Sequence, residues 1–514
     1  MIASPHAAAS SAGLDVLRRG GSAVDAAVAA NGVLAVVYPA SCGIGGDALA
    51  MVYEPRDGSV RCYNGSGRAS ASLHARSLRA AGMRAMPLRG ALTVTVPGAV
   101  RAWEDMLAAH GRMGLDELLA PAQASARDGF VATDVVARYF ALNEALLRAD
   151  ADAAALFLAR GVPRAGDMIR NAPLAETLGR IRSGGAAAFY DGPVADAIVR
   201  TVNAGGNPMT HDDVAAARTE RARPVGLRWH GLDVLAHPPN SQGTVAPIVL
   251  GALAGDGLAP RTLWHHFAIE AIKNAFDARD ARFADPAAMR APVDDLLATE
   301  SLRAVRDAID PARARPRGAA VDRGGTIAVV AFDADGQAVS LIESLFMNFG
   351  SGVVAGGTGI FLHNRGAYFS LETGHPNELA GGKRPLHTLS PGMLLRDGRP
   401  ELVYGTMGGD GQVQTHVQIA HNLYELELDV QLAIDAPRFV YGRDSESAFA
   451  DLVRVESRMP DDVVAGLRAR GHAVEVLGAF DGALGHACAI AVDRERGTLA
   501  GGSDPRADSA ALGL

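Results

Sequence analysis

The chain has 514 residues, which is enough for one large domain with a deep core or for several ordinary domains. Its hydrophobic content of 48% and charged content of 21% are typical of a globular enzyme. A net charge of −8 and an aromatic content of 5% argue against a nucleic-acid partner and against an anionic membrane partner, because both need basic or stacking surfaces.

The cysteines and the N-terminal residues indicate the cellular compartment. Cys42, Cys62 and Cys488 stand far apart without metal-ligand spacing, so we expect buried, reduced thiols. The histidines are scattered as well, and we expect neither a metal nor a cofactor. Residues 1–6 carry no secretory signal, and no apolar run reaches the length of a membrane span. The prediction is a cytoplasmic protein.

Periodicity predicts the elements of the first half. Residues 6–37 are expected to form a helix, a Gly-Gly turn and a second helix; strands are expected over 48–53, 60–63 and 93–97, and a helix over 99–109. The glycines at 43–46 indicate a tight turn, because no phosphate-binding lysine accompanies them. Residues 115–220 read as helical scaffold. In a helix over 264–283, Glu270, Lys273 and Asp277 are spaced for ion pairs on a solvated face.

The pattern changes after residue 284. A surface helix and then a mobile linker over 311–323 are predicted, because proline, arginine and alanine dominate there. Short strands follow at 326–332, 337–345, 358–362, 391–395 and 402–406, with a helix near 412–426 and a last strand at 487–492.

A Gly-Gly-Thr sequence at 324–326 stands at the head of a predicted hairpin whose turn is Asp-Ala-Asp-Gly. It suits an enzyme that cuts its own chain before Thr326, since glycine permits a bent backbone in which the hydroxyl attacks the preceding carbonyl. The freed α-amine then serves as base for that hydroxyl. From this pattern alone, a loop entering a sheet is the commoner interpretation.

Further motifs follow in order: Phe-Gly-Ser-Gly-Val-Val-Ala at 349–355, Lys-Arg-Pro-Leu at 383–386, Ser-Pro at 390–391 and Gly-Gly at 408–409. With Gly-Gly-Ser-Ala-Val-Asp-Ala-Ala at 20–27 and Gly-Gly-Ser-Asp-Pro-Arg at 501–506, they resemble the γ-glutamyltranspeptidase family of self-processing N-terminal nucleophile (Ntn) hydrolases along essentially the whole chain.

The resemblance implies an α+β fold, the four-layer αββα sandwich, built as one large domain from two processed subunits. Cleavage between Gly325 and Thr326 would give a large subunit, 1–325, and a small catalytic subunit, 326–514. The two subunits of one precursor would be partners, and a dimer of such heterodimers is left open.

The resemblance also implies roles in acyl transfer. Thr326 would be the nucleophile, and Ser344 occupies the place of a second threonine that supports it. Gly408 and Gly409 match the glycine pair whose N–H groups face the oxyanion of the tetrahedral intermediate.

The acyl pocket departs from the family pattern. Phe346 replaces an asparagine, while Arg365 and Tyr368 stand where a glutamine and an aspartate hold the substrate's α-amino group. The arginine that grips the α-carboxylate has no clean match, since Gly65 falls there. The candidate substrate-binding residues are Arg365, Tyr368, Phe346, the pair His387 and Thr388 in place of two serines, and Arg68, which is close to Gly65.

An acidic partner is lost and an arginine gained, so the pocket favours a carboxylate or keto acid over an ammonium group. We therefore expect hydrolysis of a small amide whose acyl group is oxalyl or a dicarboxylic half-amide, as in the family's acylase and amidohydrolase branch. Three alternatives stay open: a γ-glutamyltransferase or glutathione hydrolase with an altered pocket, a C–C or C–N hydrolase of a natural-product pathway, and a non-catalytic relative. Retention of Thr326, Ser344 and both glycines argues against the last.

Overall fold

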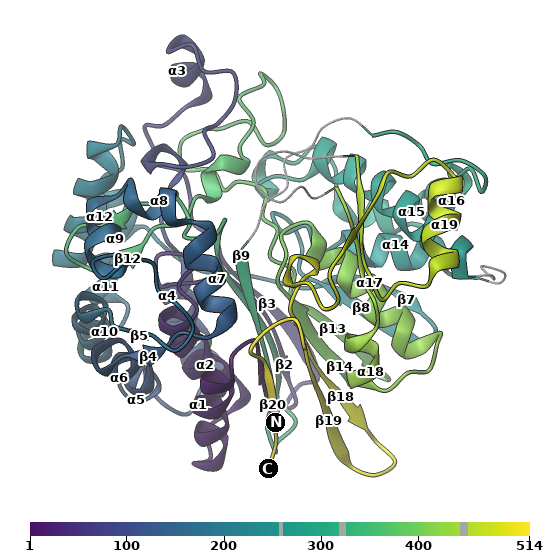
Figure 1. Ribbon diagram of the computed structural model, residues 1–514, viewed down its shortest axis with the longest axis horizontal. Helices are drawn as coiled ribbons and strands as arrows, with labels where there is room; N and C mark the ends of the chain where they lie inside the picture. Colours follow the sequence, from purple (N-terminus) through teal and green to yellow (C-terminus); the bar gives the residue numbers. More distant parts are fainter. Residues whose placement is uncertain (256–260, 318–324, 443–450) are drawn as a thin grey trace.

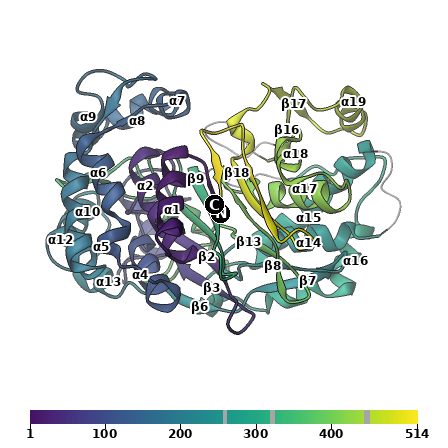
Figure 2. The ribbon, with the colours of Figure 1, turned by 90° about the horizontal axis from the view of Figure 1, so that it is seen from below.

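The computed structural model describes residues 1–255, 261–317, 325–442 and 451–514. Two β-sheets lie face to face in the centre of the molecule, and helices cover the outer face of each sheet (Figures 1 and 2). The four layers confirm the predicted αββα sandwich and the α+β class.

The first sheet has seven antiparallel strands and contains the expected cleavage point. β9 lies between β1 and β10, and β10 pairs with β2, so strands from before and after the expected cleavage point pair with one another in one sheet. Its order is β20 (Ala510–Leu512), β1 (Ile2–Ser4), β9 (Gly325–Phe332), β10 (Ala338–Phe346), β2 (Asp47–Glu54), β3 (Ser59–Gly65) and β6 (Glu220–Ala222).

The second sheet has six strands, also antiparallel. Its order is β19 (Thr498–Ser503), β18 (Ala487–Asp493), β14 (Arg399–Thr406), β13 (Gly392–Arg396), β8 (Leu232–Ala236) and β7 (Val225–Trp229). Smaller pairings join β11 (Val354–Ala355) to β12 (Ile360–Phe361), β4 (Phe130–Val131) to β5 (Met168–Ile169), and β15 (Phe439–Tyr441) to β16 (Val453–Glu456) and β17 (Val474–Leu477).

Alternation along β9 decides which side chains reach which layer. Ile327 and Val329 pack in the core under the first helical layer, whereas Ala328 and Val330 pack between the sheets. Because side chains alternate with a period of two, Thr326 shares the sheet–sheet face with Ala328.

The first helical layer is built around α2, all of whose residues are buried. It contains α1 (Ala7–Arg18), α2 (Ala23–Val37), α4 (Ala99–His110), α5 (Leu115–Leu118), α6 (Ala120–Asp128), α7 (Asp134–Leu142), α8 (Glu144–Arg148), α9 (Ala151–Phe157), α10 (Ala172–Gly184), α11 (Ala187–Tyr190), α12 (Pro193–Ala204) and α13 (His211–Ala215). α3 (Ala75–Ala80) projects from the top of this side in Figure 1.

The second helical layer covers the six-stranded sheet. It contains α14 (Val245–Leu253), α15 (Arg261–Arg282), α16 (Thr299–Asp307), α17 (Gly411–Tyr424), α18 (Val430–Asp435) and α19 (Asp461–Ala469). Five short 3₁₀ turns complete the described elements: η1 (Ala91–Thr93), η2 (Pro286–Ala288), η3 (Val293–Leu297), η4 (Arg365–Tyr368) and η5 (Gly482–Leu484).

Most strongly periodic segments were predicted correctly, including α1, α2, α4, α15, α17 and the hairpin β9–β10. The strand expected over 93–97 is wrong. Val94 and Val96 are buried in the helical core, and the carbonyl of Val94 accepts a hydrogen bond from the Asn207 side chain instead of a neighbouring strand. The strands β1, β4–β8, β11, β15–β17, β19 and β20 were not predicted.

The expectation of a solvated face on α15 is wrong for Glu270 and Lys273, although their predicted ion pair is present and Asp277 is partly exposed. Glu270 and Lys273 are each 2% exposed. The Lys273 Nζ donates to Glu270 Oε1 (2.8 Å) and to the carbonyl of Arg315 (2.7 Å). This helix face is covered by the segment 310–317, which lies far away in the sequence.

The same contacts correct the prediction of a mobile linker for its first part. Arg315 and Arg317 both bind the carboxylate of Asp277, at 2.7 and 2.6 Å. The backbone N–H of Arg317 donates to Asp451 (3.0 Å). The chain is therefore held on α15 as far as Arg317; residues 318–323 of the predicted linker lie outside the described residues.

Within the described part of the chain, no helix has the length and apolar character needed to cross a bilayer. Cys42, Cys62 and Cys488 are unpaired and buried, as predicted.

Replacing Asp277 by Asn should loosen the segment 311–317. The change removes the carboxylate that two arginines share, and partly exposed pairs of this kind contribute about 1 kcal/mol. We expect trypsin to cut after Arg313 or Arg317 about fivefold faster in Asp277→Asn, as followed by the masses of the products.

The matched control is Asp294→Asn, which neutralises an exposed carboxylate on η3. Equal cleavage rates in wild type and Asp277→Asn would show that Asp277 does not anchor the segment.

Candidate active site

Thr326 and Ser344 meet at the point where β9 begins and β10 ends. The Thr326 Oγ1 lies 2.8 Å from the carbonyl oxygen of Gly325 and 3.1 Å from the Ser344 Oγ. The Ser344 Oγ donates to the same carbonyl (2.5 Å) and accepts from the Phe346 N–H (2.7 Å). Both hydroxyls are thus held at the peptide bond between residues 325 and 326, and both residues are 1% exposed.

Lack of space explains the glycine at position 325. A Cβ there would lie 2.6 Å from the Asn348 Oδ1 and 3.3 Å from the carbonyl oxygen of Ala40. Any larger residue would therefore displace the Asn348 side chain and crowd the backbone beside the Thr326 hydroxyl.

Gly408 and Gly409 form the turn between β14 and α17. Their φ angles of 127° and 56° lie in the region that favours glycine. Among residues 1–255, 261–317, 325–442 and 451–514, no acceptor receives either N–H group. The turn lies at the N-terminus of a 14-residue helix, whose dipole favours negative charge there. These two N–H groups can therefore stabilise an oxyanion.

Asp410 follows these glycines and is fully engaged. Its carboxylate accepts from the Arg279 Nη1 (2.5 Å) and Nη2 (3.1 Å) and from the Tyr368 hydroxyl (2.9 Å). Burial opposes the charge of Arg279, but Asp280 and Asp410 raise the pKa of its guanidinium well above the ordinary value. The predicted substrate residue Tyr368 is thus turned toward Asp410.

Unlike Arg279, Arg365 makes no hydrogen bond to a carboxylate among the described residues. It is 0% exposed, its Nη1 donates to the Thr388 Oγ1 (2.9 Å), and its guanidinium carbon lies 4.1 Å from the centroid of the Phe346 ring. Its Nε and Nη2 have no hydrogen-bond partner in the described part of the chain. Burial lowers the pKa of Arg365 to about 10, so the group stays charged at neutral pH.

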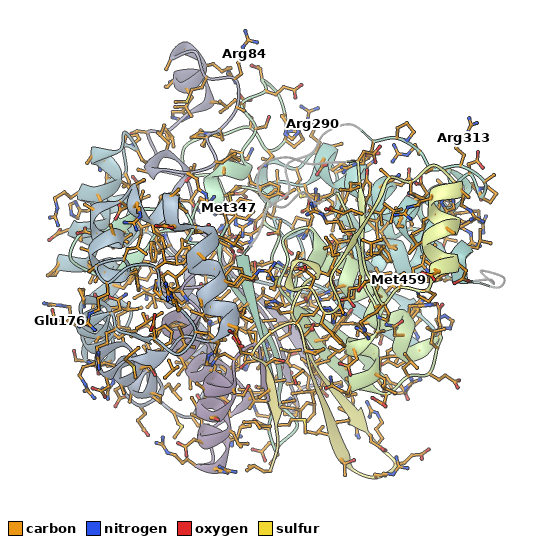
Figure 3. All side chains as sticks on the ribbon, in the orientation of Figure 1. Arg84, Glu176, Arg290, Arg313, Met347 and Met459 are labelled. Carbon is orange, nitrogen blue, oxygen red and sulfur yellow. The ribbon has the colours of Figure 1, made fainter. Side chains whose placement is uncertain are left out.

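Phe346 adopts a left-handed backbone, with φ of 77°. Such a conformation in a non-glycine residue is costly, and it occurs here at the irregular end of the β9–β10 pairing. It places the ring against both Arg365 and Tyr368, whose ring centroid is 5.3 Å away. The neighbouring Met347 lies beyond the upper end of β9, between the two helical layers (Figure 3).

Both ring nitrogens of His387 make hydrogen bonds within the protein. Its Nε2 lies 3.1 Å from the Asp47 Oδ2, and its Nδ1 accepts from the Leu389 N–H. Burial, followed by the charge of Arg365, lowers the pKa of His387 to about 3, so the ring is neutral and donates to Asp47. The Gly67 N–H donates to the other oxygen of Asp47 (3.0 Å). Sequence reasoning missed Asp47, although the Gly-Ile-Gly-Gly-Asp motif ends on it.

Arg68 is bound to the protein itself. Its Nη2 donates to Glu220 (2.6 Å), and its Nη1 donates to Asp285 (3.1 Å) and to the carbonyl of Gly382 (2.7 Å). Two carboxylates already balance its charge, so the geometry gives it a structural role at this corner.

Three buried residues, His266, Glu270 and His472, offer ligand atoms within 4.8 Å of one another. The Lys273 ammonium already occupies Glu270 (2.8 Å), and the His266 Nδ1 is paired with the His472 Nε2 (2.8 Å). The cluster is a satisfied hydrogen-bond network, and the lysine disfavours a further cation.

Glu343 points from β10 away from Ser344, toward α2. Its carboxyl oxygens accept from the Gly43 N–H (3.0 and 3.2 Å) and from the Asn31 amide (3.2 Å). The Gly46 N–H donates to the Gly43 carbonyl (2.8 Å), so the glycines at 43–46 form a tight turn, as predicted, and the Glu343 carboxyl group binds its first N–H group. Burial raises the pKa of Glu343 from its ordinary 4.5 to about 8.

Comparison with known proteins identifies relatives over the whole chain. A family model described as gamma-glutamyltranspeptidase matches residues 9–514. A glutathione hydrolase-like YwrD proenzyme of Bacillus subtilis is 40% identical, covering 100% of this chain and 98% of the relative. An oxamate amidohydrolase proenzyme of Klebsiella pneumoniae is 38% identical, with coverage of 100% and 98%. The crystal structure of a cephalosporin acylase from Bacillus halodurans superposes with a TM-score of 0.92 at 35% identity, covering 99% of this chain and 94% of the acylase.

The raised pKa of Glu343 predicts a pH-dependent cost to stability. Between pH 4.5 and 8 the unfolded chain has released this proton while the folded chain still holds it, so the free energy of unfolding falls as pH rises. The slope is at most about 1.4 kcal/mol per pH unit. The difference in melting temperature between wild type and Glu343→Gln should therefore shift in favour of the variant from pH 5 to pH 8. A difference that stays constant with pH would show that Glu343 is ionised in the folded protein.

Proposed function

We infer the function from one premise: this chain belongs to the γ-glutamyltranspeptidase family and is an Ntn-type amidohydrolase. We propose that it cuts its own precursor before Thr326 and then hydrolyses a small amide whose acyl group carries a carboxylate. The relatives named as proenzymes support the first part. The relative named oxamate amidohydrolase supports an acyl group with a carboxylate, and the one named cephalosporin acylase supports hydrolysis of an acyl bond.

Self-processing begins with the hydroxyl held at residue 325. The Thr326 Oγ1 attacks the carbonyl carbon of Gly325, the hydroxyl proton passes to the nitrogen of Thr326 as the C–N bond breaks, and an ester forms between the two residues. Water then hydrolyses this ester. The products are a carboxylate on Gly325 and a free α-amine on Thr326, that is, the subunits 1–325 and 326–514. Ser344 donates to the carbonyl oxygen on which charge develops (2.5 Å).

Substrate cleavage repeats the attack with the new α-amine as base. The amine takes the proton from the Thr326 Oγ1, the oxygen attacks the amide carbon, and the N–H groups of Gly408 and Gly409 stabilise the oxyanion. The proton passes to the leaving amine, which departs and leaves an acyl ester on Thr326. Water hydrolyses the ester, so the net reaction converts an amide and water into a carboxylic acid and an amine.

The observation that carries the substrate class is the incomplete hydrogen bonding of Arg365. A buried guanidinium with two unpartnered nitrogens is costly, and a carboxylate supplies the acceptors and the opposite charge. Arg279 shows the contrast, because Asp410 already binds it bidentately. Thr388 fixes one nitrogen of Arg365 and Phe346 supports its face, so the group is preorganised.

A γ-glutamyl substrate is the nearest alternative, since one relative is named glutathione hydrolase-like. Its ammonium group would face the charge of Arg365, which disfavours it. The cytoplasmic location and the dimer of heterodimers stay predictions.

Replacing Arg365 by Met should abolish the preference for charged acyl groups. We expect wild type to hydrolyse oxamate and succinamate far faster than propionamide or a γ-glutamyl anilide. In Arg365→Met, kcat/KM for the two half-amides should fall about 100-fold, because two charge-assisted hydrogen bonds to the carboxylate are lost. Propionamide should be affected little. Ammonia release measures all three amides, and anilide cleavage is followed by absorbance.

Arg68→Met is the matched control, since that arginine is paired with carboxylates of the protein. Any loss there should fall equally on charged and neutral amides. Selectivity for the half-amides that survives in Arg365→Met would contradict the proposal, and preferred cleavage of the γ-glutamyl anilide would favour the alternative.

A further inference from the structure

A single buried side chain connects the two loops of the site. Gln242 lies in the loop before α14 and is 0% exposed. Its amide nitrogen donates to the carbonyl of Gly409 (2.9 Å) and to the carbonyl of Thr388 (3.0 Å). The first carbonyl belongs to the glycine turn at 408–409, and the second to the residue that binds Arg365.

Arg279, on α15, completes the connection. It is 1% exposed, and its Nη1 donates both to the Gln242 Oε1 (2.6 Å) and to Asp410 (2.5 Å), while its Nη2 also reaches Asp410 (3.1 Å). The guanidinium therefore fixes the orientation of the Gln242 amide and holds the residue next to Gly409.

The glycine turn needs such anchoring. Glycine has the widest backbone freedom, but an oxyanion donor has to lie about 2.7–3.1 Å from the developing charge. The carbonyl of Gly408 accepts from the Gly411 N–H (2.8 Å), which fixes the peptide plane that carries the Gly409 N–H. The next peptide plane carries the carbonyl of Gly409. That carbonyl accepts from the Gln242 amide and from the Gln412 N–H (3.2 Å), and these two hydrogen bonds fix the plane.

We propose that Gln242 and Arg279 are positioning residues. They hold the oxyanion glycines in their reactive orientation and set the distance between these glycines and the carboxylate site at Arg365. The inference rests on the proposed function in assigning Gly408 and Gly409 to the oxyanion. It adds that one hydrogen-bonded unit, anchored on α15 in the large subunit, aligns two loops of the small subunit.

Gln242→Met and Arg279→Lys test the role. Met has a similar volume and removes both loop contacts, while Lys keeps the charge and loses the fork. We expect kcat to fall about 100-fold in each variant, with KM changed less than threefold, because Arg365 and its partner Thr388 Oγ1 remain. Self-cleavage into two fragments should be complete in both, since its contacts at Gly325 come from Thr326 and Ser344.

The kcat of the double variant distinguishes a positioning role from a purely structural one. If both residues act on one geometry, Gln242→Met/Arg279→Lys should be no slower than the slower single variant. The control is Glu54→Gln, which weakens the hydrogen bonds of another buried carboxylate, to His110 and to the exposed Arg56, at the opposite end of β2 from Asp47. It should lower the melting temperature and leave kcat within about twofold.

Rates are measured with the amide that wild type hydrolyses best in the substrate series, charged or not. The positioning role therefore stays testable if the carboxylate proposal fails. Unchanged kcat in Gln242→Met, multiplied losses in the double variant, or loss of self-cleavage together with activity would each overturn the inference.

Discussion

The hydrogen bond from the Thr326 hydroxyl to the carbonyl of Gly325 (2.8 Å) is the contact around which the molecule is arranged. It requires Thr326 to face the space between the two sheets, and the alternation of β9 provides this. It also requires Ser344 opposite, which the irregular end of the β9–β10 pairing provides. Since β9 lies between β1 and β10, both subunits of the proposed processed enzyme contribute strands that hold this geometry.

The charged groups around the site differ in whether the protein supplies their partners. The protein itself satisfies other charged groups around the site: the buried Arg279 by Asp410, the partly exposed Arg68 by Glu220 and Asp285, and the buried Asp47 by His387 and the backbone of Gly67. Arg365 differs, because two of its nitrogens have no partner among the described residues. A buried charge is tolerable when a ligand completes it, and the proposed substrate carboxylate would supply the missing acceptors of Arg365.

How much the sequence predicts depends on how local the cause is. The helices and strands with strong periodicity, the place of Thr326 at the head of a hairpin and the glycine turn at 408–409 before a helix could be predicted, because the pattern or the resemblance lies in contiguous residues. The catalytic roles of these residues stay predictions. Burial of Glu270 and Lys273 could not, since the covering segment 310–317 lies some 40 residues away. Gln242 and Arg279 were missed for the same reason: their roles arise from contacts between loops that only the fold brings together.

The most direct test of the central claim is the intact mass of the purified protein under denaturing conditions, beside Thr326→Ala. The account predicts that the 53.2 kDa chain appears in wild type as fragments of about 34 and about 20 kDa, the smaller beginning at Thr326, and that the variant stays whole. A single uncut chain in both samples would contradict it, because Thr326 would then have no free α-amine to act as base.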